Sequence, residues 1–122
     1  MIRTRYAAAR PYVTRDGSLI RELLHPAQHG NVQQSLAEAE VAPGASTQLH
    51  YHTHSEELYH IVAGQGLMQL GTEQFTVSVG DTVCIPPGTP HCITNTATTA
   101  LRILCCCAPP YAHDDTELVQ EP

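Results

Sequence analysis

Two stretches decide the fold of this chain: GASTQLHYHTHSEELYHIVAG at residues 44–64 and GDTVCIPPGTPHCITN at residues 80–95. The first is bounded by Gly44 and Gly64, and the second contains the Pro86-Pro87-Gly88 turn and ends at Asn95; Gly, Pro and Asn are residues that form turns between short strands. Together the two stretches contain three histidines and a glutamate: His50, His52, Glu57 and His91. Imidazole and carboxylate groups suit a divalent transition metal, so these stretches predict both strands and a metal site.

The composition describes one small acidic domain. A chain of 122 residues suits a single hydrophobic core. The net charge of −6 comes from 12 acidic residues, six arginines and no lysine, so neither nucleic acid nor an anionic membrane is an expected partner. No stretch reaches the roughly 18 apolar residues of a membrane span. Five cysteines without disulfide-framework spacing, and no export signal, predict reduced thiols and a cytoplasmic protein.

Apolar residues alternate in short runs along most of the chain, which predicts an all-β sandwich or barrel. The expected strands are 18–24, 35–41, 47–52, 57–62, 67–70, 74–79, 82–85, 91–95 and 100–107. Residues 35–41 (SLAEAEV) also suit a helix by propensity, but Pro43 and Gly44 end the run, so we expect a strand there. The expected division is an N-terminal arm at 1–17, the barrel at 18–108 and a loosely held tail at 109–122.

Strand geometry explains how ligands from distant parts of the chain could meet. Residues i and i+2 of a strand share one face, so His50 and His52 project together. Glu57 follows after a short turn, and antiparallel pairing can bring it beside the two histidines. His91 comes from the second stretch, where the turn at residues 86–88 would aim it. We expect all four side chains to point into the barrel and share one ion.

The two stretches resemble the signature motifs of the cupin superfamily. The matching pattern is Gly44-x5-His50-x-His52-x4-Glu57-x6-Gly64, then Gly80-x5-Pro86-x-Gly88-x2-His91-x3-Asn95. The 15 residues between the motifs are typical of small microbial single-domain cupins. The resemblance implies a jelly-roll barrel, or double-stranded β-helix, of antiparallel strands. It also implies one divalent metal ion per chain, held by His50, His52, Glu57 and His91. Fe, Mn, Ni, Zn, Co and Cu all suit these ligands.

Four protein ligands in an octahedral shell would leave two positions for water, substrate or dioxygen. We therefore expect a metal-dependent enzyme, an isomerase, lyase or dioxygenase, acting on a small oxygenated metabolite. One alternative is a non-catalytic protein that binds a sugar or carboxylate through its metal. Another is a barrel whose metal only stabilises the fold. The resemblance also implies a homodimer paired through sheet edges, with residues 1–17 a candidate for exchange between subunits.

The expected pocket is mainly apolar, which suits a small organic ligand. Alternation places Gln48, Tyr59, Ile61 and Ile93 on the face of the metal ligands. Further expected wall residues are Met68, Leu70, Val83, Ile85, Leu101 and Ile103. Tyr59 is a candidate acid or hydrogen-bond donor, although a wall residue with a satisfied hydroxyl is the commoner case. Arg21 is a candidate partner for a substrate carboxylate, although a surface arginine is the commoner case.

Other reactive side chains are expected to lie away from the metal. His54 and Glu56 are turn residues expected in solvent, with a substitute ligand as the alternative for each. His60 is one residue out of phase with Tyr59 and should face outward.

The Cys105–Cys107 run cannot hold one ion with all three thiols, because alternation separates Cys106 from the other two. Cysteine is small and often buried, so core packing is the expectation for this run. A thiol near the pocket mouth is the alternative.

Overall fold

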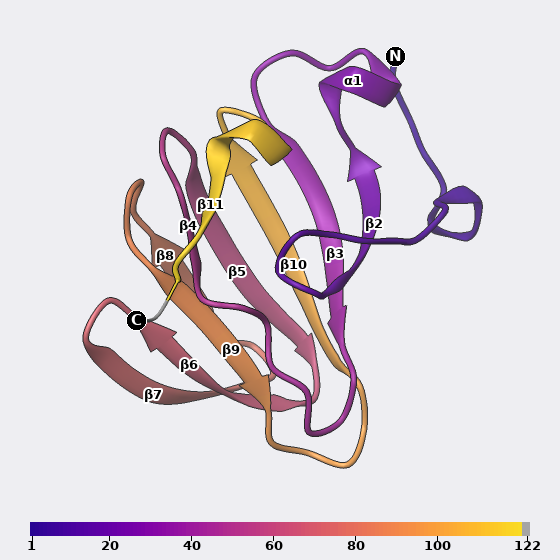
Figure 1. The fold of residues 1–122 in the computed structure, drawn as a ribbon. Coiled ribbons are helices and arrows are strands. Elements are labelled where there is room, and N and C mark those ends of the chain that lie inside the picture. The colour runs from indigo at the N-terminus through magenta and orange to yellow at the C-terminus, as the bar shows by residue number, and fades with distance from the viewer. Residues whose placement is uncertain (121–122) are drawn as a thin grey trace.

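The computed structural model describes residues 1–120 and shows two facing antiparallel sheets (Figure 1). The first sheet has the order β1 (Tyr12–Val13), β2 (Leu19–Leu24), β3 (Ser35–Val41), β10 (Leu101–Ala108), β5 (Glu56–Ala63), β8 (Thr82–Ile85). The second has the order β11 (Thr116–Leu118), β4 (His50–His52), β9 (His91–Asn95), β6 (Gln65–Leu70), β7 (Glu73–Ser78). This arrangement confirms the expected all-β barrel of jelly-roll type. None of the helices formed by residues 1–120 has the length and apolarity of a membrane span.

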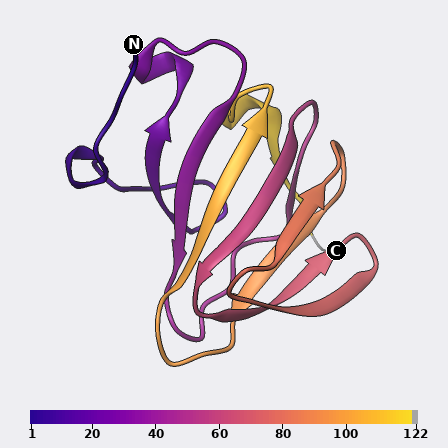
Figure 2. The same cartoon turned by 180° about the vertical axis from the view of Figure 1, so that it is seen from behind.

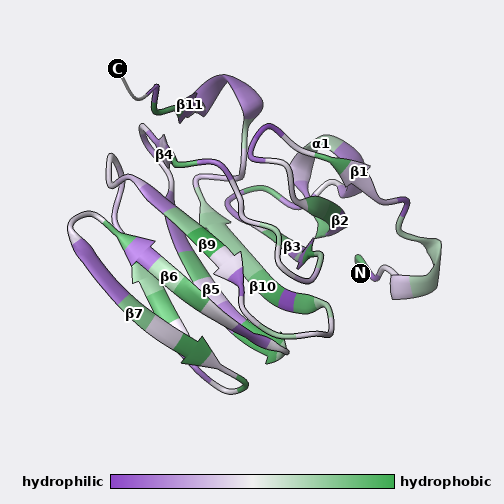
Figure 3. Ribbon diagram, turned by 60° about the horizontal axis from the view of Figure 1, so that its bottom comes forward, coloured by the Kyte–Doolittle hydropathy of each residue, from purple (hydrophilic) through white to green (hydrophobic). Residues whose placement is uncertain are grey.

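Alternation decides which side chains fill the space between the sheets. Burial alternates along β10 from Leu101 to Cys107 and along β9 from His91 to Asn95, and Figure 3 shows green, hydrophobic bands on these strands. Seen from behind in Figure 2, β10 runs between β3 and β5. Residues 35–41 form the strand β3 because Ala37 and Ala39 can then face the interior from a strand paired on both sides.

The two ends of the barrel differ in how they are filled. Large side chains close one end, where Ile61, Met68 and Ile93 have at most 1% of their surface exposed. At the other end the inward residues of β3 and β10 are small, and they include Ala37 and Cys107. Small side chains cannot fill the gap between two sheets, and this end therefore contains a cavity.

Two glycines allow the close approach of strands at the filled end. Gly64 has a φ of +85°, and a β-carbon there would lie 2.8 Å from the carbonyl oxygen of Ala100. A β-carbon on Gly66 would lie 2.9 Å from the carbonyl oxygen of Thr94. A larger residue at either position would push the strands apart, which explains why glycine stands where β5 turns into β6.

Strand β4 is shorter than the expected strand at 47–52. The Gln48 N–H donates to the carbonyl oxygen of Asp16 at 2.8 Å, while the Thr47 N–H donates to Ile93 at 2.9 Å. Because of the hydrogen bond from Gln48 to Asp16, the residues just before β4 do not form regular strand pairing. This bond also brings the turn that contains Asp16 beside the start of β4.

A single helical turn that the strand pattern did not predict, α1 (Pro26–His29), follows β2. Its first residue is a proline, which suits the first turn of a helix because that position needs no N–H donor. Gly30 ends the turn in the left-handed conformation, with a φ of +88°.

The first part of the N-terminal arm, around Thr4 and Tyr6, lies on the outer face of the first sheet of its own chain. The Thr4 hydroxyl donates to the carbonyl oxygen of Leu23 at 2.6 Å, and the Tyr6 hydroxyl donates to Glu38 at 2.6 Å. Exchange of this arm between subunits stays a prediction.

The C-terminal segment is more ordered than expected. After a short 3₁₀ turn (His113–Asp115), β11 pairs with β4 and extends the second sheet, as the yellow ribbon in Figure 1 shows. Backbone bonds from Thr53 to Asp115 and from Val119 to Leu49, each 2.9 Å, attach it. The expectation of a loose tail was wrong here because β4 has a free edge that this segment covers. Residues 121–122 of that tail lie outside the described residues.

Candidate metal centre

Three histidines converge at the open end of the barrel. His50 and His52 come from β4, and His91 comes from β9, directly opposite His50. One ring nitrogen from each lies within 4.8 Å of the others, and all three side chains are buried. The structure thus brings together three histidines that lie in two separate motifs of the sequence.

Two of these imidazoles are held by backbone carbonyl groups. His50 Nδ1 lies 2.7 Å from the carbonyl oxygen of Gln48, and His91 Nδ1 lies 2.9 Å from that of Thr89. A carbonyl oxygen only accepts hydrogen bonds, so each Nδ1 carries the hydrogen. Each Nε2 is then left with a lone pair, which is the form of histidine that binds metals.

The third imidazole is held by the C-terminal strand. His52 Nδ1 lies 3.1 Å from the hydroxyl oxygen of Thr116. That hydroxyl donates its own hydrogen to the carbonyl oxygen of Ala112 at 3.0 Å, so it accepts from His52. The lone pair of His52 Nε2 therefore also faces the centre.

Glu57 reaches the histidines from the first sheet. Its Oε1 lies 3.1 Å from His52 Nε2 and 3.4 Å from His91 Nε2. Its Oε2 accepts a hydrogen bond from the Cys107 thiol at 3.2 Å. Burial raises the pKa of Glu57, but the neighbouring His52 and His91 outweigh burial and lower the pKa to about 2. The group is therefore a carboxylate at neutral pH.

The donor atoms fit a divalent transition metal. His91 Nε2 is buried and makes no hydrogen bond within residues 1–120. A buried polar atom without a hydrogen bond is costly unless another partner binds it. Three imidazole nitrogens and one carboxylate are the donors that Fe, Mn, Ni, Zn, Co and Cu accept. The residues present could therefore hold such an ion.

Asp16 is a carboxylate of this site that the sequence pattern did not reveal. Its Oδ1 accepts from the backbone N–H of Ser18 at 2.9 Å and from the Ser18 hydroxyl at 2.6 Å. Its Oδ2 lies 3.6 Å from His50 Nε2, and the residue is 8% exposed. The sequence placed Asp16 in an arm outside the barrel. The signal that could have found it is a period of two: residues 12, 14, 16, 18, 20 and 22 all line the cavity.

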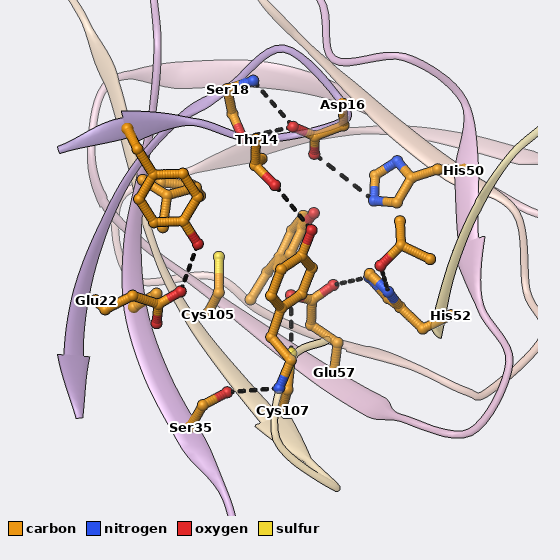
Figure 4. A pocket seen from close by; sticks show the side chains of 17 residues that line it. Thr14, Asp16, Ser18, Glu22, Ser35, His50, His52, Glu57, Cys105 and Cys107 are labelled. Atoms are coloured by element: carbon orange, nitrogen blue, oxygen red, sulfur yellow. Dashed lines mark hydrogen bonds and ion pairs between the residues drawn. The ribbon is translucent and has the colours of Figure 1, made fainter. Parts of the chain in front are cut away.

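The cavity beside the histidines is small (Figure 4). Its volume is about 40 Å³. Its floor consists of small residues of β3 and β10, and its far wall comes from β1, β2 and the turn between them. Tyr111 lies over it from the C-terminal segment, with its ring centroid 5.8 Å from that of His52 and its hydroxyl 2.8 Å from Thr14 Oγ1. The size suits an ion together with a ligand of few atoms.

Most residues expected to line this pocket lie elsewhere. Tyr59 does line the cavity, but Ile61, Met68 and Ile93 belong to the core of the filled end. Strand alternation placed them on the correct face but could not tell one end of the barrel from the other. The same holds for Leu101 and Ile103, which also pack in that core, and for the remaining apolar wall residues, none of which lines the cavity.

Two polar residues expected in the pocket face away from it. Gln48 is exposed because its backbone binds Asp16 and leaves the regular strand. Arg21 is out of phase with the inward residues of β2, and its guanidinium lies 3.1 Å from Glu40 and 3.5 Å from Glu38 on the outer face. The surface role of Arg21, given as the commoner case, is therefore the one that the structure shows.

Burial keeps one phenol and two thiols of the cavity protonated. Burial raises the pKa of Tyr59 well above its usual value, and the charge of Glu57 adds to the effect. Burial and Glu57 also raise the pKa values of the Cys105 and Cys107 thiols. All three groups are therefore hydrogen-bond donors at neutral pH. Both thiols line the cavity, while Cys106 faces the other side.

The turn residues near the ligands lie outside the cavity. The side chain of His54 is 78% exposed and its Nδ1 lies 2.7 Å from Asp115. Glu56 is exposed. His60 lies outward, with its Nδ1 2.8 Å from the Thr82 hydroxyl. All three side chains therefore lie away from the histidine cluster, as expected.

We expect the substitution Thr116→Val to weaken metal binding about tenfold, because removing a partner of a ligating histidine frees its ring to rotate. Zinc affinity measured by competition with a chelating dye checks this. The control is Thr76→Val, a similar change at an exposed position of β7. Equal zinc affinities for Thr116→Val and the wild type would contradict the assigned role of the hydroxyl.

The stability of the metal-free protein should fall as the pH drops below about 6.5. Burial and the neighbouring His91 lower the pKa of His50 below its usual 6.5. The unfolded chain therefore takes up a proton before the folded chain does, and acid favours unfolding until the folded pKa is reached. Urea unfolding at pH 7.5 and 5.5 should show a smaller pH effect in His50→Gln than in the wild type. An equal effect in both proteins would contradict this assignment.

Comparison with known proteins identifies the family. A family model for the cupin domain matches residues 37–107. An uncharacterised protein of Methanocaldococcus jannaschii, MJ1618, is 54% identical over 120 residues, covering 98% of this chain and 96% of that protein. An oxalate-binding protein of Thermotoga maritima is 30% identical over 86 residues, covering 70% of this chain and 67% of that protein.

A solved structure supports the fold. The polyketide cyclase RemF of Streptomyces resistomycificus superposes with a TM-score of 0.83 at 23% identity, covering 100% of this chain and 87% of that one. The family match includes the three histidines and Glu57, whereas Asp16 and Thr116 lie outside it. On the family match and these similarities, this chain belongs to the cupin family.

Proposed function

We propose that this protein is a metal-dependent enzyme that transfers a proton on a small oxygenated metabolite, as an isomerase or a lyase. The observation that carries the proposal is the carboxylate of Asp16, held 3.6 Å from His50 Nε2 at the edge of the metal centre. A divalent ion bound there would act as a Lewis acid on an oxygen of the ligand.

Asp16 has the features of a general base. Two hydrogen bonds from Ser18 fix Oδ1 and leave Oδ2 facing the histidines. This oxygen could accept a proton from the carbon next to the polarised oxygen, while the electron pair of the C–H bond stays with the substrate. Returning the proton to another atom completes an isomerisation. In an elimination, that electron pair forms a new C=C bond, and the group on the neighbouring carbon leaves with the electron pair of its own bond.

Tyr59 is proposed as a hydrogen-bond donor in this reaction. It lies in the same cavity, its ring centroid is 6.0 Å from that of His91, and it keeps its proton at neutral pH. A neutral phenol can donate to a substrate oxygen on which negative charge develops. This role deepens the expectation from the sequence.

A dioxygenase and a non-catalytic binding protein are the competing functions. The relative described as an oxalate-binding protein favours the second. The carboxylate of Asp16 favours proton transfer over both, because neither dioxygen chemistry nor simple binding requires a base beside the metal. The competing functions also differ in what they do to a ligand, which an experiment can separate.

The double substitution His50→Ala and His91→Ala should reduce bound metal from about one ion per chain to nearly none, because it removes two of the four donors. Metal content of purified protein, measured by mass spectrometry after loading, checks this. His60→Ala, an outward histidine of β5, is the matched control and should retain its metal. Full retention in the double variant would refute the metal centre.

The reaction class can be tested on zinc-, manganese- and iron-loaded protein in D₂O. Small hydroxy-carbonyl compounds are screened by NMR for deuterium at carbon, with dissolved oxygen followed in parallel. We expect deuterium uptake that Asp16→Asn reduces at least 100-fold, because a general base contributes roughly 10²–10⁴ to a rate. Oxygen consumption would support the dioxygenase. Binding without exchange or consumption would support the binding protein.

We also propose a homodimer in a reducing compartment, the cytoplasm. Cys84, Cys105, Cys106 and Cys107 form no disulfide bond. Leu58 and Val62, both 39% exposed, lie on the outer face of β5 beside the edge strand β8. Apolar residues beside a sheet edge suit pairing with a second copy. Light scattering should give twice the chain mass of 13.3 kDa; the mass of one chain at micromolar concentration would refute the dimer.

A further inference from the structure

One carboxylate in the cavity has an oxygen without a partner. Glu22 on β2 is 7% exposed, and its Oε1 accepts a hydrogen bond from the Tyr12 hydroxyl at 2.7 Å. Its Oε2 is buried and makes no hydrogen bond with any described residue. A buried carboxylate oxygen without a donor costs free energy. A ligand group that donates to this oxygen would remove that cost.

Glu22 lies across the cavity from the metal centre. In the register of the first sheet, Glu22 is opposite Ala37, Ala37 is opposite Cys105, and Cys105 is opposite Tyr59. Three strand spacings, roughly 14 Å, therefore separate the backbones of Glu22 and Tyr59. Ala37 and Cys105, which lie between them, have small side chains that line the cavity. Figure 4 shows Glu22 on the left and His50 on the right of this cavity.

The charges around the cavity disfavour an anionic ligand. Asp16, Glu22 and Glu57 line it, and none of the arginines of residues 1–120 does. Arg21 on the same strand points outward to the carboxylate of Glu40. A divalent ion would leave one net negative charge among these groups, so a dicarboxylate or phosphate would meet repulsion. Hydroxyl groups from neighbouring residues, such as Tyr12, suit a ligand with hydroxyl groups of its own.

We propose that the cavity takes a neutral, short-chain polyhydroxylated compound, with one hydroxyl donating to Glu22 Oε2 and the oxygen at its other end lying at the three histidines. This inference rests on the proposed function, because it assumes the same metal centre. The small free volume limits the ligand to a few carbons. The lack of cationic side chains in its lining, as residues 1–120 form it, distinguishes this cavity from a site for a dicarboxylate, because a dicarboxylate is bound by cationic side chains.

The probes for the test are three compounds of matched size: dihydroxyacetone, malonate and 1,3-diamino-2-propanol. Their dissociation constants are measured by ligand-observed NMR on zinc-loaded protein. Wild-type protein should bind dihydroxyacetone at least tenfold more tightly than malonate. Glu22→Gln should weaken dihydroxyacetone binding about tenfold, because the amide places a donor where the ligand hydroxyl needs an acceptor. Tyr12→Phe, which removes the hydroxyl that holds Glu22, should weaken it about threefold.

The control is Glu117→Gln, an equal charge change at an exposed residue of β11, which should leave all three constants unchanged. Zinc content is measured for every variant, so that loss of the metal centre is separated from loss of ligand recognition. The proposal is overturned if zinc-loaded wild type prefers malonate or the diamine, or binds no dihydroxyacetone. An unchanged affinity in Glu22→Gln and Tyr12→Phe would also overturn it. A chain without stoichiometric zinc would instead refute the proposed function.

Discussion

The size of the inward side chains on β3 and β10 is the constraint on which the rest of this structure depends. Both strands are paired on both sides, so their inward residues must fill the gap between the two sheets or leave it open. Ala39 and Ile103 meet the large apolar residues of the filled end, whereas Ser35 and Cys107 do not fill the other end. The barrel therefore has a rigid core that supports the metal centre and a space in which a ligand can lie.

The cavity also decides how charged groups are arranged around it. The carboxylate of Glu57 is buried, and its neighbours His52 and His91 keep it ionised. Its other oxygen accepts a hydrogen bond from the Cys107 thiol. A buried charge needs such partners because water is absent. The imidazole and carboxylate groups therefore surround the centre before any ion binds. An ion that binds there would exchange its water ligands for contacts with these groups.

Much of this could be predicted from the sequence, and the failures have physical reasons. The motif spacings and strand alternation predicted that the three histidines and Glu57 lie together, and the structure places these side chains near one another, because a period of two decides which face a side chain occupies. Alternation says nothing about depth, so Ile61 and Ile93 were assigned to the pocket although they fill the core. Asp16 was missed because one backbone bond from Gln48, formed outside regular pairing, sets its position.

The pairing of β11 with β4 gives the C-terminal segment a thermodynamic role. Thr116 both closes an exposed sheet edge and fixes the ring of His52, so docking of this strand and binding of an ion at the histidines share one free energy of coupling. Such coupling is reciprocal: an ion that binds more tightly when the strand is docked must also hold the strand in place. The last strand is thus an intramolecular effector of the metal centre, and truncation or cleavage of the segment that carries it would act at a distance on affinity for the ion.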